Sequence, residues 1–354
     1  MQKTRRGLGI FRKAEPGISP DAGERAYTYV KAAGIIGKSF VGRRVSALYN
    51  IERLSELDRL VFPYSSRDLP GKELLADLEA RIEKRAVDSI IAVVKSYKTP
   101  PEFFVLLIRG WEYEDLKNTL IALSNTEPVK PAFTDLQSFG TVNFSAWPDI
   151  SAMLQGTEFE YLLKMMDKGN VSLQTELDRH YYTSLWEALI KLKARDRQAS
   201  ERILAEEIAL RNVAWALRLR TYYQMKADEV RSHLVDINAV FRGRRHSLAE
   251  DALSSLEFPL DNRQAWQDWK RVGFLNPETP EEWRADPRYF QNTAGRYLYR
   301  MARRSFRTNP SSLDSVYCFI KIKQFEEDVL TSSAEGLGMG MTSQDVFTML
   351  GVES

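Results

Sequence analysis

Apolar residues recur every three or four positions along most of the chain. Between residues 72 and 95 this spacing sets an apolar stripe against a mostly charged one, as in an amphipathic helix. Pro100-Pro101 suits the start of a further helix, because a first-turn proline loses no hydrogen bond. The same periodicity predicts helices over residues 21–48, 101–123, 157–193, 198–225, 287–307, 312–334 and 342–350. The pattern therefore predicts an all-α fold.

Evidence for strands is thin. Alternation is best at residues 141–144, which are too few to found a sheet. They lie in a Pro- and Gly-containing stretch, residues 128–148, that we interpret as a connector. A second connector is predicted over residues 255–287, where prolines and a glycine interrupt short helical pieces.

Three of the predicted helices share a weak sequence echo. Its anchor positions, Asp115, Asn212 and Val329, lie 97 and 117 residues apart. This spacing suggests similar helical units of about 110 residues, although helical periodicity alone makes such echoes common. We therefore divide the chain into a basic leader and three helical units, with approximate bounds at residues 1–20, 21–125, 126–235 and 236–354.

Composition narrows the function. The 354 residues include 50 basic and 48 acidic side chains, so the net charge of +2 disfavours a dedicated nucleic-acid binder. A single cysteine, Cys318, excludes an internal disulfide and fits a reducing compartment. The apolar runs fall short of the roughly 18 residues that a membrane span needs, and the leader lacks the apolar centre of a signal peptide.

Two glycine-containing segments resemble ligand loops. Residues 34–39 end like a phosphate-binding loop, but Ala32 occupies the first glycine position and a predicted helix precedes the segment. We interpret these small residues as allowing close helix packing. In residues 336–341 the glycines are interpreted as ending the helix over 312–334, since they tolerate the positive φ common at helix C-termini. No cofactor is expected at either segment.

The chain offers no nucleophile–base pairing, so we predict no catalytic, cofactor-binding or metal-binding residue. Cys318 is expected to be a buried small apolar side chain, and His180 a helix-surface or hydrogen-bonded one. Asn212, a polar residue within an apolar helix, is expected to set the register with a neighbouring helix. The basic clusters at residues 242–245 and 303–304 fit either a solvated face or a surface that docks acidic groups.

Four segments together resemble the family of V-type ATP synthase C subunits, whose eukaryotic relatives are the V-ATPase d subunits. They are residues 27–34, the Leu-Asp-Arg-His-Tyr-Tyr run at 177–182, the Glu-Ile-Ala-Leu-Arg-Asn-Val run at 207–213 with Leu217-Arg218, and residues 322–350. The motif positions are Asp115, Asn212, Arg218, Glu326, Gly336 and Gly340. Departures from the family pattern include Ala209, Val329, Thr331 and Leu337, which suggests a divergent branch and puts particular polar contacts of the last helices in doubt.

The resemblance implies a funnel of three related helical domains around a central hollow. It implies a non-catalytic rotor subunit with one copy per complex, in which the hollow receives the central shaft and the wide end sits on the membrane proteolipid ring. The protein would be cytoplasmic and attached peripherally through that membrane sector. Proton or sodium transport, and the direction of ATP turnover, would belong to other subunits.

Alternatives stay open at this point. An α-helical scaffold unrelated to ATPases shares the composition, although no repeat of 20 to 50 residues is visible. A helical enzyme with an unrecognised site and a helical nucleic-acid binder are the others. Under the rotor hypothesis, Arg242, Arg244 and Arg245 are expected to form part of a surface that docks the shaft or the ring through acidic groups.

Overall fold

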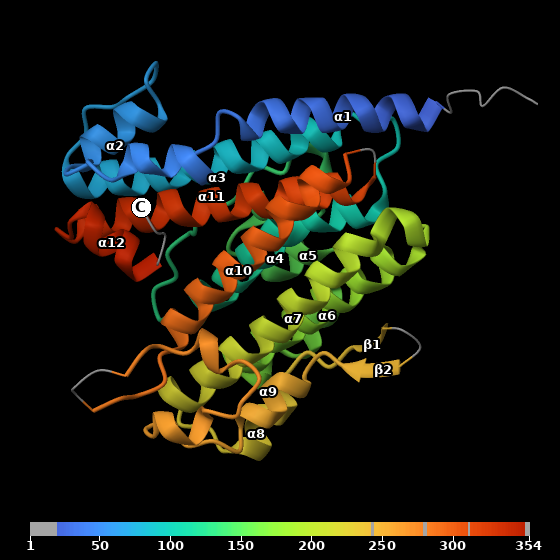
Figure 1. Cartoon of the computed structure of the whole chain (residues 1–354), viewed down its shortest axis with the longest axis vertical. Coiled ribbons are helices and arrows are strands. Elements are labelled where there is room, and N and C mark those ends of the chain that lie inside the picture. Colours follow the sequence, from blue (N-terminus) through green and yellow to red (C-terminus); the bar gives the residue numbers. More distant parts are fainter. Residues whose placement is uncertain (1–19, 242–243, 279–281, 311, 351–354) are drawn as a thin grey trace, which may run out of the picture.

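The computed structural model describes residues 20–241, 244–278, 282–310 and 312–350, and this part of the chain is all-α apart from one hairpin (Figure 1). The predicted leader lies outside the described residues, except for Pro20. The first half contains α1 (Pro20–Ile36), η1 (Gly42–Leu48), α2 (Leu54–Val61), α3 (Gly71–Val94), α4 (Glu102–Leu123), η2 (Gln137–Phe139), η3 (Phe144–Ala146), α5 (Ile150–Leu154), η4 (Glu160–Lys164) and η5 (Met166–Lys168). The second half contains α6 (Asn170–Lys191), α7 (Ala194–Tyr222), α8 (Ala227–Ser232), β1 (Asn238–Phe241), β2 (Arg244–Ser247), α9 (Glu250–Ser255), η6 (Arg263–Trp266), η7 (Val272–Phe274), α10 (Pro287–Thr308), α11 (Asp314–Gly338) and α12 (Ser343–Leu350).

The strongly periodic segments form helices where the sequence predicts them. Helices α3, α4, α7, α10, α11 and α12 match their predicted ranges to within a few residues. The prolines behave as expected at the start of α4, where Pro101 is the N-cap residue. Both predicted connectors lack long helices and contain short helical turns instead.

Two predicted helices are shorter than expected. The range 21–48 is broken, because α1 ends at Ile36 and a 3₁₀ helix begins at Gly42, where φ is 60°. The range 157–193 is also wrong in its first part, which forms two 3₁₀ turns. Helix α6 starts only after Gly169, whose φ of 78° interrupts the helical path. A glycine with positive φ thus lies at the start of η1 and directly before α6.

The glycine tail departs from its predicted structure. Helix α11 continues through Gly336 and ends at Gly338, so these glycines do not terminate it at residue 334. Gly340 takes the positive φ, at 79°, directly after the helix. Gly336 instead packs against α12: a Cβ at this position would collide with the Val346 side chain. The segment thus serves helix packing as well as helix termination.

One hydrophobic core is shared by α1, α3, α4, α6, α7, α10 and α11. Phe103, Phe104, Tyr317 and Phe319 are fully buried in it, and burying such side chains stabilises by roughly 1.5–3 kcal/mol each. The predicted burial of Cys318 in an apolar environment is confirmed.

Three smaller cores extend from this shared core. One joins η1, α2 and α3 to α11 and α12, the second joins α4 to α5 and α6, and the third joins α7, α8 and α9 to α10. In Figure 1 the first lies in the upper part of the molecule and the third in the lower part. The first core combines residues of the predicted first and third units. The division into three related units stays a prediction.

A β-hairpin between α8 and α9 was not predicted. Strands β1 and β2 pair antiparallel, with Asn238 opposite Ser247 and Val240 opposite Arg245. The hairpin extends from the lower part of the molecule in Figure 1. Four-residue strands carry too little alternation to be distinguished from loop in the sequence.

Candidate functional site

A hollow of about 550 Å³ opens between α4, α6, α7, α10 and α11. Charged and aromatic side chains line it, and several of them remain exposed to solvent, including Glu114, Arg211, Arg218 and Asp328. The hollow is therefore open to water. Its lining comes from helices far apart in the sequence, so its shape depends on how these helices are tied to one another.

One wall is tied by ion pairs around Asp178 of α6. This carboxylate accepts from Lys117 Nζ of α4 at 2.6 Å and from Arg211 Nη2 of α7 at 2.8 Å. Burial alone would raise the pKa of Asp178, but the charges of Arg211 and Lys117 hold the pKa below its ordinary value. The ring of Tyr182 lies 5.3 Å from the Arg211 guanidinium. Three helices thus meet at one ionised carboxylate.

A second set of contacts in the lining lies around Glu207 of α7, one turn before Arg211. Lys321 of α11 donates to Glu207 Oε1 at 2.7 Å, and the Tyr317 hydroxyl donates to Oε2 at 3.0 Å. Next along α11, burial and the neighbouring Asp328 carboxylate raise the pKa of Glu327 to about 8. The lining therefore carries charge at both clusters, with positive and negative groups interleaved.

The predicted motif position Asp115 is buried and holds a loop. Its Oδ2 accepts from the backbone N–H of Thr134 at 2.8 Å. One turn earlier, Glu112 accepts from the backbone N–H groups of Thr141 and Val142 at 2.5 and 2.7 Å. Burial raises the pKa of Asp115 to about 7, and the charges of Glu83 and Glu112 add to this rise.

Asn212 holds the base of the β-hairpin. Its Oδ1 accepts from Val235 N at 2.8 Å, and its Nδ2 donates to the carbonyls of Val235 and Leu248 at 2.8 and 3.2 Å. The residue is buried and every one of these partners is backbone. The expectation that Asn212 sets register with a neighbouring helix is therefore wrong, because it fixes the segments that flank the hairpin.

Glu326 fixes the chain just after α1. It accepts from the backbone N–H of Phe40 at 2.8 Å and forms a buried ion pair with Lys323. Arg85 Nη2 lies 3.5 Å from the same carboxylate. Burial would raise the pKa of Glu326, but Lys323 and the Phe40 N–H lower it overall. Lys323 was missed in the sequence, although its i,i+3 spacing from Glu326 in an apolar helix is a usable signal.

The structure places the other predicted site residues apart from one another. Arg218 lies in the hollow, 5.8 Å from the ring of Trp215. Arg244 and Arg245 belong to β2, and Arg245 is exposed. Arg242 lies outside the described residues. The ion-paired residues Lys117 and Lys321 were not predicted, because Asp178 and Glu207, with which they pair, come from other helices.

The described residues offer little reactive chemistry. His180 Nδ1 lies 2.7 Å from the Tyr113 hydroxyl, in the hydrogen-bonded role predicted for it. Burial raises the pKa of the Cys318 thiol, which disfavours a thiolate. No group of three or more His, Cys, Asp or Glu side chains suited to a metal ion occurs among the described residues. Nor does any helix there combine the length and apolarity needed to traverse a bilayer.

The segment of residues 34–39 has few free backbone donors. The N–H groups of Gly37, Lys38 and Ser39 donate to carbonyls of α1 at 3.0 Å each. We expected the small residues of this segment to allow close helix packing. At Gly34 that expectation is wrong, because nothing lies within 4 Å of the place where its Cβ would be.

The family described as ATP synthase (C/AC39) subunit matches residues 64–346, which is most of the chain. This protein belongs to that family.

Individual relatives are more distant. The chain is 27% identical to an uncharacterized protein of Treponema pallidum (strain Nichols) over 316 residues, covering 89% of this chain and 92% of the relative. It is 27% identical to the C subunit of the A-type ATP synthase of Methanosarcina mazei over 202 residues and 24% identical to the Methanosarcina acetivorans protein of the same name over 195 residues. These two matches cover about half of this chain and half of each archaeal protein.

Proposed function

We propose that this chain is a non-catalytic subunit of a V/A-type ATP synthase or ATPase that couples the central shaft to the membrane proteolipid ring. In this proposal three related helical units surround the hollow, one copy is present per complex, and attachment to the membrane runs through the ring. Family membership supports a place in an ATP synthase complex. The coupling role goes beyond family membership, and the following features support it.

The water-open hollow carries the proposal. An α-helix about 10 Å wide occupies roughly 400 Å³ per turn, so about 550 Å³ is room for the foot of a shaft helix, not for a long inserted rod. Interleaved charges along the lining give such a foot acidic and basic partners.

Stiffness is the second requirement of a coupling subunit. The ion pairs around Asp178 and Glu207 link α4, α6, α7 and α11 across the hollow walls. Behind them the shared core is packed from aromatic and aliphatic side chains, and such interiors deform little under load. Torque applied inside the hollow would therefore reach the whole body.

The hairpin, whose base is held by Asn212 of the hollow lining, supplies a candidate docking surface. Asn212 clamps its base, and β2 carries Arg244 and Arg245. Two arginines on a clamped ribbon suit acidic groups of the shaft or the ring. Arg242, the third arginine of the predicted cluster, precedes them by two positions in the sequence.

Co-purification from solubilised membranes tests the proposal. The tagged full chain should recover rotary-head and proteolipid-ring subunits. Replacing Arg244 and Arg245 by glutamate should reduce this recovery, with a larger reduction at low salt than at high salt. An exposed cation on η5, Lys168→Glu, is the control and should leave recovery unchanged.

The two parts of the proposal fail separately. Loss of both head and ring subunits from the wild-type preparation would contradict the coupling role. Unchanged recovery of the arginine variant at low salt would remove the hairpin from the docking surface and leave the coupling role intact.

A further inference from the structure

Helix α10 carries an unusual concentration of one charge. Between Pro287 and Thr308 it contains six arginines and no acidic residue, although the whole chain is nearly neutral. Arg300, Arg303, Arg304 and Arg307 lie close together along the helix and form what we call the arginine stripe. At 100° per residue these four positions fall within an arc of about 100° on the helix surface, over about 10 Å of its length.

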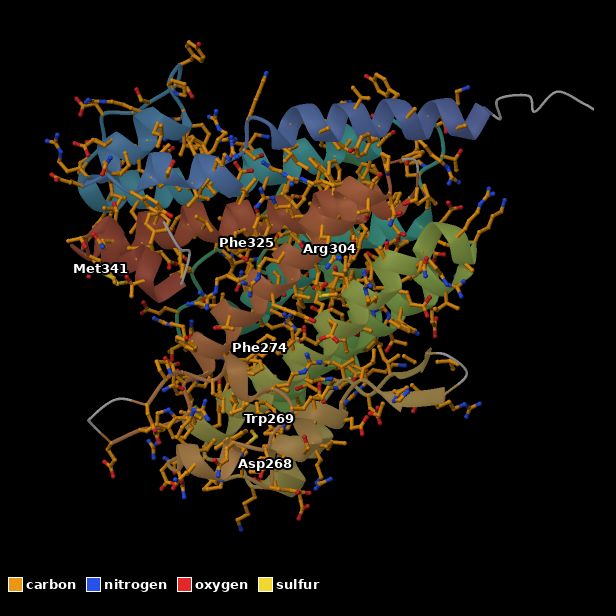
Figure 2. All side chains as sticks on the ribbon, viewed as in Figure 1. Asp268, Trp269, Phe274, Arg304, Phe325 and Met341 are labelled. Atoms are coloured by element: carbon orange, nitrogen blue, oxygen red, sulfur yellow. The ribbon has the colours of Figure 1, made fainter. Side chains whose placement is uncertain are left out.

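Three of the four stripe arginines face solvent. Arg300, Arg304 and Arg307 are exposed, and Figure 2 shows Arg304 on α10. The guanidinium of Arg303 lies against Gly42 of η1, with Nη2 3.1 Å from the place of a glycine Cβ. Arg43 and Arg44 of η1 are also exposed, and they extend the basic surface beyond the helix.

The stripe lacks the acidic partners that basic side chains find elsewhere on this protein. Arg81 pairs with Asp58 and Asp77, Arg197 with Glu201, and Lys270 with Asp251. None of the four stripe arginines forms an ion pair with a carboxylate of the described residues. Four like charges placed this close repel one another, a cost that an external anion would remove.

We propose that the arginine stripe docks an acidic α-helix of a partner protein. Arginine, unlike lysine, presents a planar fork that binds carboxylates in a bidentate manner, and it is enriched at protein interfaces while lysine is depleted. Glutamates at steps of three and four on a helix laid along α10 would match the three exposed arginines of the stripe. This inference does not depend on the proposed coupling role.

A membrane surface fits the stripe less well. Interfacial helices bury apolar side chains among lipid tails beside their basic residues. The large hydrophobic side chains exposed among the described residues include Tyr27 and Val30 of α1 and Val240 of β1, but none on α10. A charged rod without an apolar edge matches a folded acidic partner.

Binding of a defined peptide tests the inference on the full chain. The probe is an alanine-rich helical peptide with four glutamates on one face, and its reference is a peptide of equal composition with the glutamates spread around the helix. At low salt the first peptide should bind at least tenfold more tightly than the second. Replacing Arg300, Arg304 and Arg307 by glutamate should weaken this binding at least tenfold.

A matched variant separates the stripe from net charge. Replacing the exposed cations Arg59, Lys72 and Lys168 by glutamate changes the total charge equally and should alter binding by less than threefold. Vesicles containing phosphatidylserine should bind wild type and stripe variant equally. If the stripe variant does not fold by circular dichroism, the arginines are replaced by glutamine instead.

Three outcomes would overturn the inference. Equal weakening in both charge variants would attribute binding to net charge. Equal affinity for the two peptides would remove the helical match. Arginine-dependent vesicle binding without preference for the one-faced peptide would assign the stripe to a lipid surface.

Discussion

At the scale of single residues, three buried polar side chains each hold the backbone of a distant segment. Asp115 and Asn212, two anchors of the sequence echo, each accept a hydrogen bond from the N–H of a loop residue. In the third helix of the echo, Glu326 does the same one turn away from the anchor Val329. Asn212 accepts its hydrogen bond with a neutral amide oxygen, whereas Asp115 accepts its hydrogen bond with a carboxyl group that can titrate.

This difference makes a pH-dependent prediction for Asp115→Asn. The pKa of Asp115 is about 7 in the folded state and about 4 in the unfolded state, so folding takes up a proton between these values. Stability from this group is therefore greatest below pH 4 and falls as the pH rises to 7. The Asn variant keeps an acceptor for Thr134 N–H and should be about 1–3 kcal/mol more stable than wild type at pH 8.

Urea unfolding at pH 5 and pH 8 measures the effect. The stability advantage of Asp115→Asn over wild type should be smaller at pH 5 than at pH 8. At pH 5 the carboxyl of Asp115 in the folded wild type is already protonated. Asp68→Asn, at an exposed position, is the control and should show no such pH dependence. A variant less stable than wild type at pH 8 would show that Asp115 acts as a well-solvated carboxylate.

The sequence identified these positions but not their partners. Asp115, Asn212 and Glu326 stand out because a polar residue interrupts an apolar helix face. Their partners lie 19, 23 and 286 residues away, in segments without any pattern of their own. Nothing local in a sequence specifies such a contact, since it follows from the tertiary arrangement.

At the scale of elements, hydrophobic periodicity predicted the long helices because each buries one continuous face. It failed where few residues carry the signal. The β-hairpin has only four residues per strand, and the 3₁₀ turns before α6 keep apolar spacing while following a different path. Left-handed glycines at residues 42 and 169 set boundaries that periodicity cannot detect.

The contact of α11 with α12 gives a prediction for Gly336→Ala. The new methyl group would occupy the place of the Val346 side chain, so α12 must shift away from α11. Overpacking of this kind costs about 1–3 kcal/mol. Thermal unfolding or urea titration of the variant should show that loss.

A second variant identifies the cause. Val346→Ala removes the colliding atoms, so the double variant should recover part of the stability lost by Gly336→Ala alone. Gly295→Ala, also within a long helix, has open space at its Cβ and serves as the control. If the double variant lost as much stability as the two single variants together, the cost of Gly336→Ala would arise in the backbone of α11 and not in the contact with Val346.

At the scale of the whole molecule, the shared core sets the arrangement of helices and the ion pairs fix the hollow between them. A central hollow inside a funnel of three units was an expectation of the family resemblance and stays a prediction; the charged lining of the observed hollow was not expected. Lys117, Asp178 and Arg211 come from three helices and only become neighbours once the body is assembled. Charge in the hollow is therefore a property of the complete fold.

The last prediction, Asp178→Asn, tests whether this charge cluster stabilises the assembled body. The pKa of Asp178 is held below its ordinary value, so its contribution is present above about pH 4 and is lost as the pH falls through the folded-state pKa. At pH 7 the variant leaves Lys117 and Arg211 with only the more exposed Glu114 as a shared carboxylate. Because the Arg211 side chain is 41% exposed, we expect a loss of about 1–3 kcal/mol, less than for a fully buried pair.

Urea unfolding from pH 7 down to pH 3.5 should show the difference from wild type narrowing as the pH falls, opposite in sign to the profile of Asp115→Asn. Amide exchange should also quicken in α4, α6 and α7, because Asp178 ties these helices together. Asp167→Asn, exposed on η5, should change neither measurement. A loss that stays constant with pH would assign the role of Asp178 to packing, and the hollow would then owe its rigidity to the apolar core behind it.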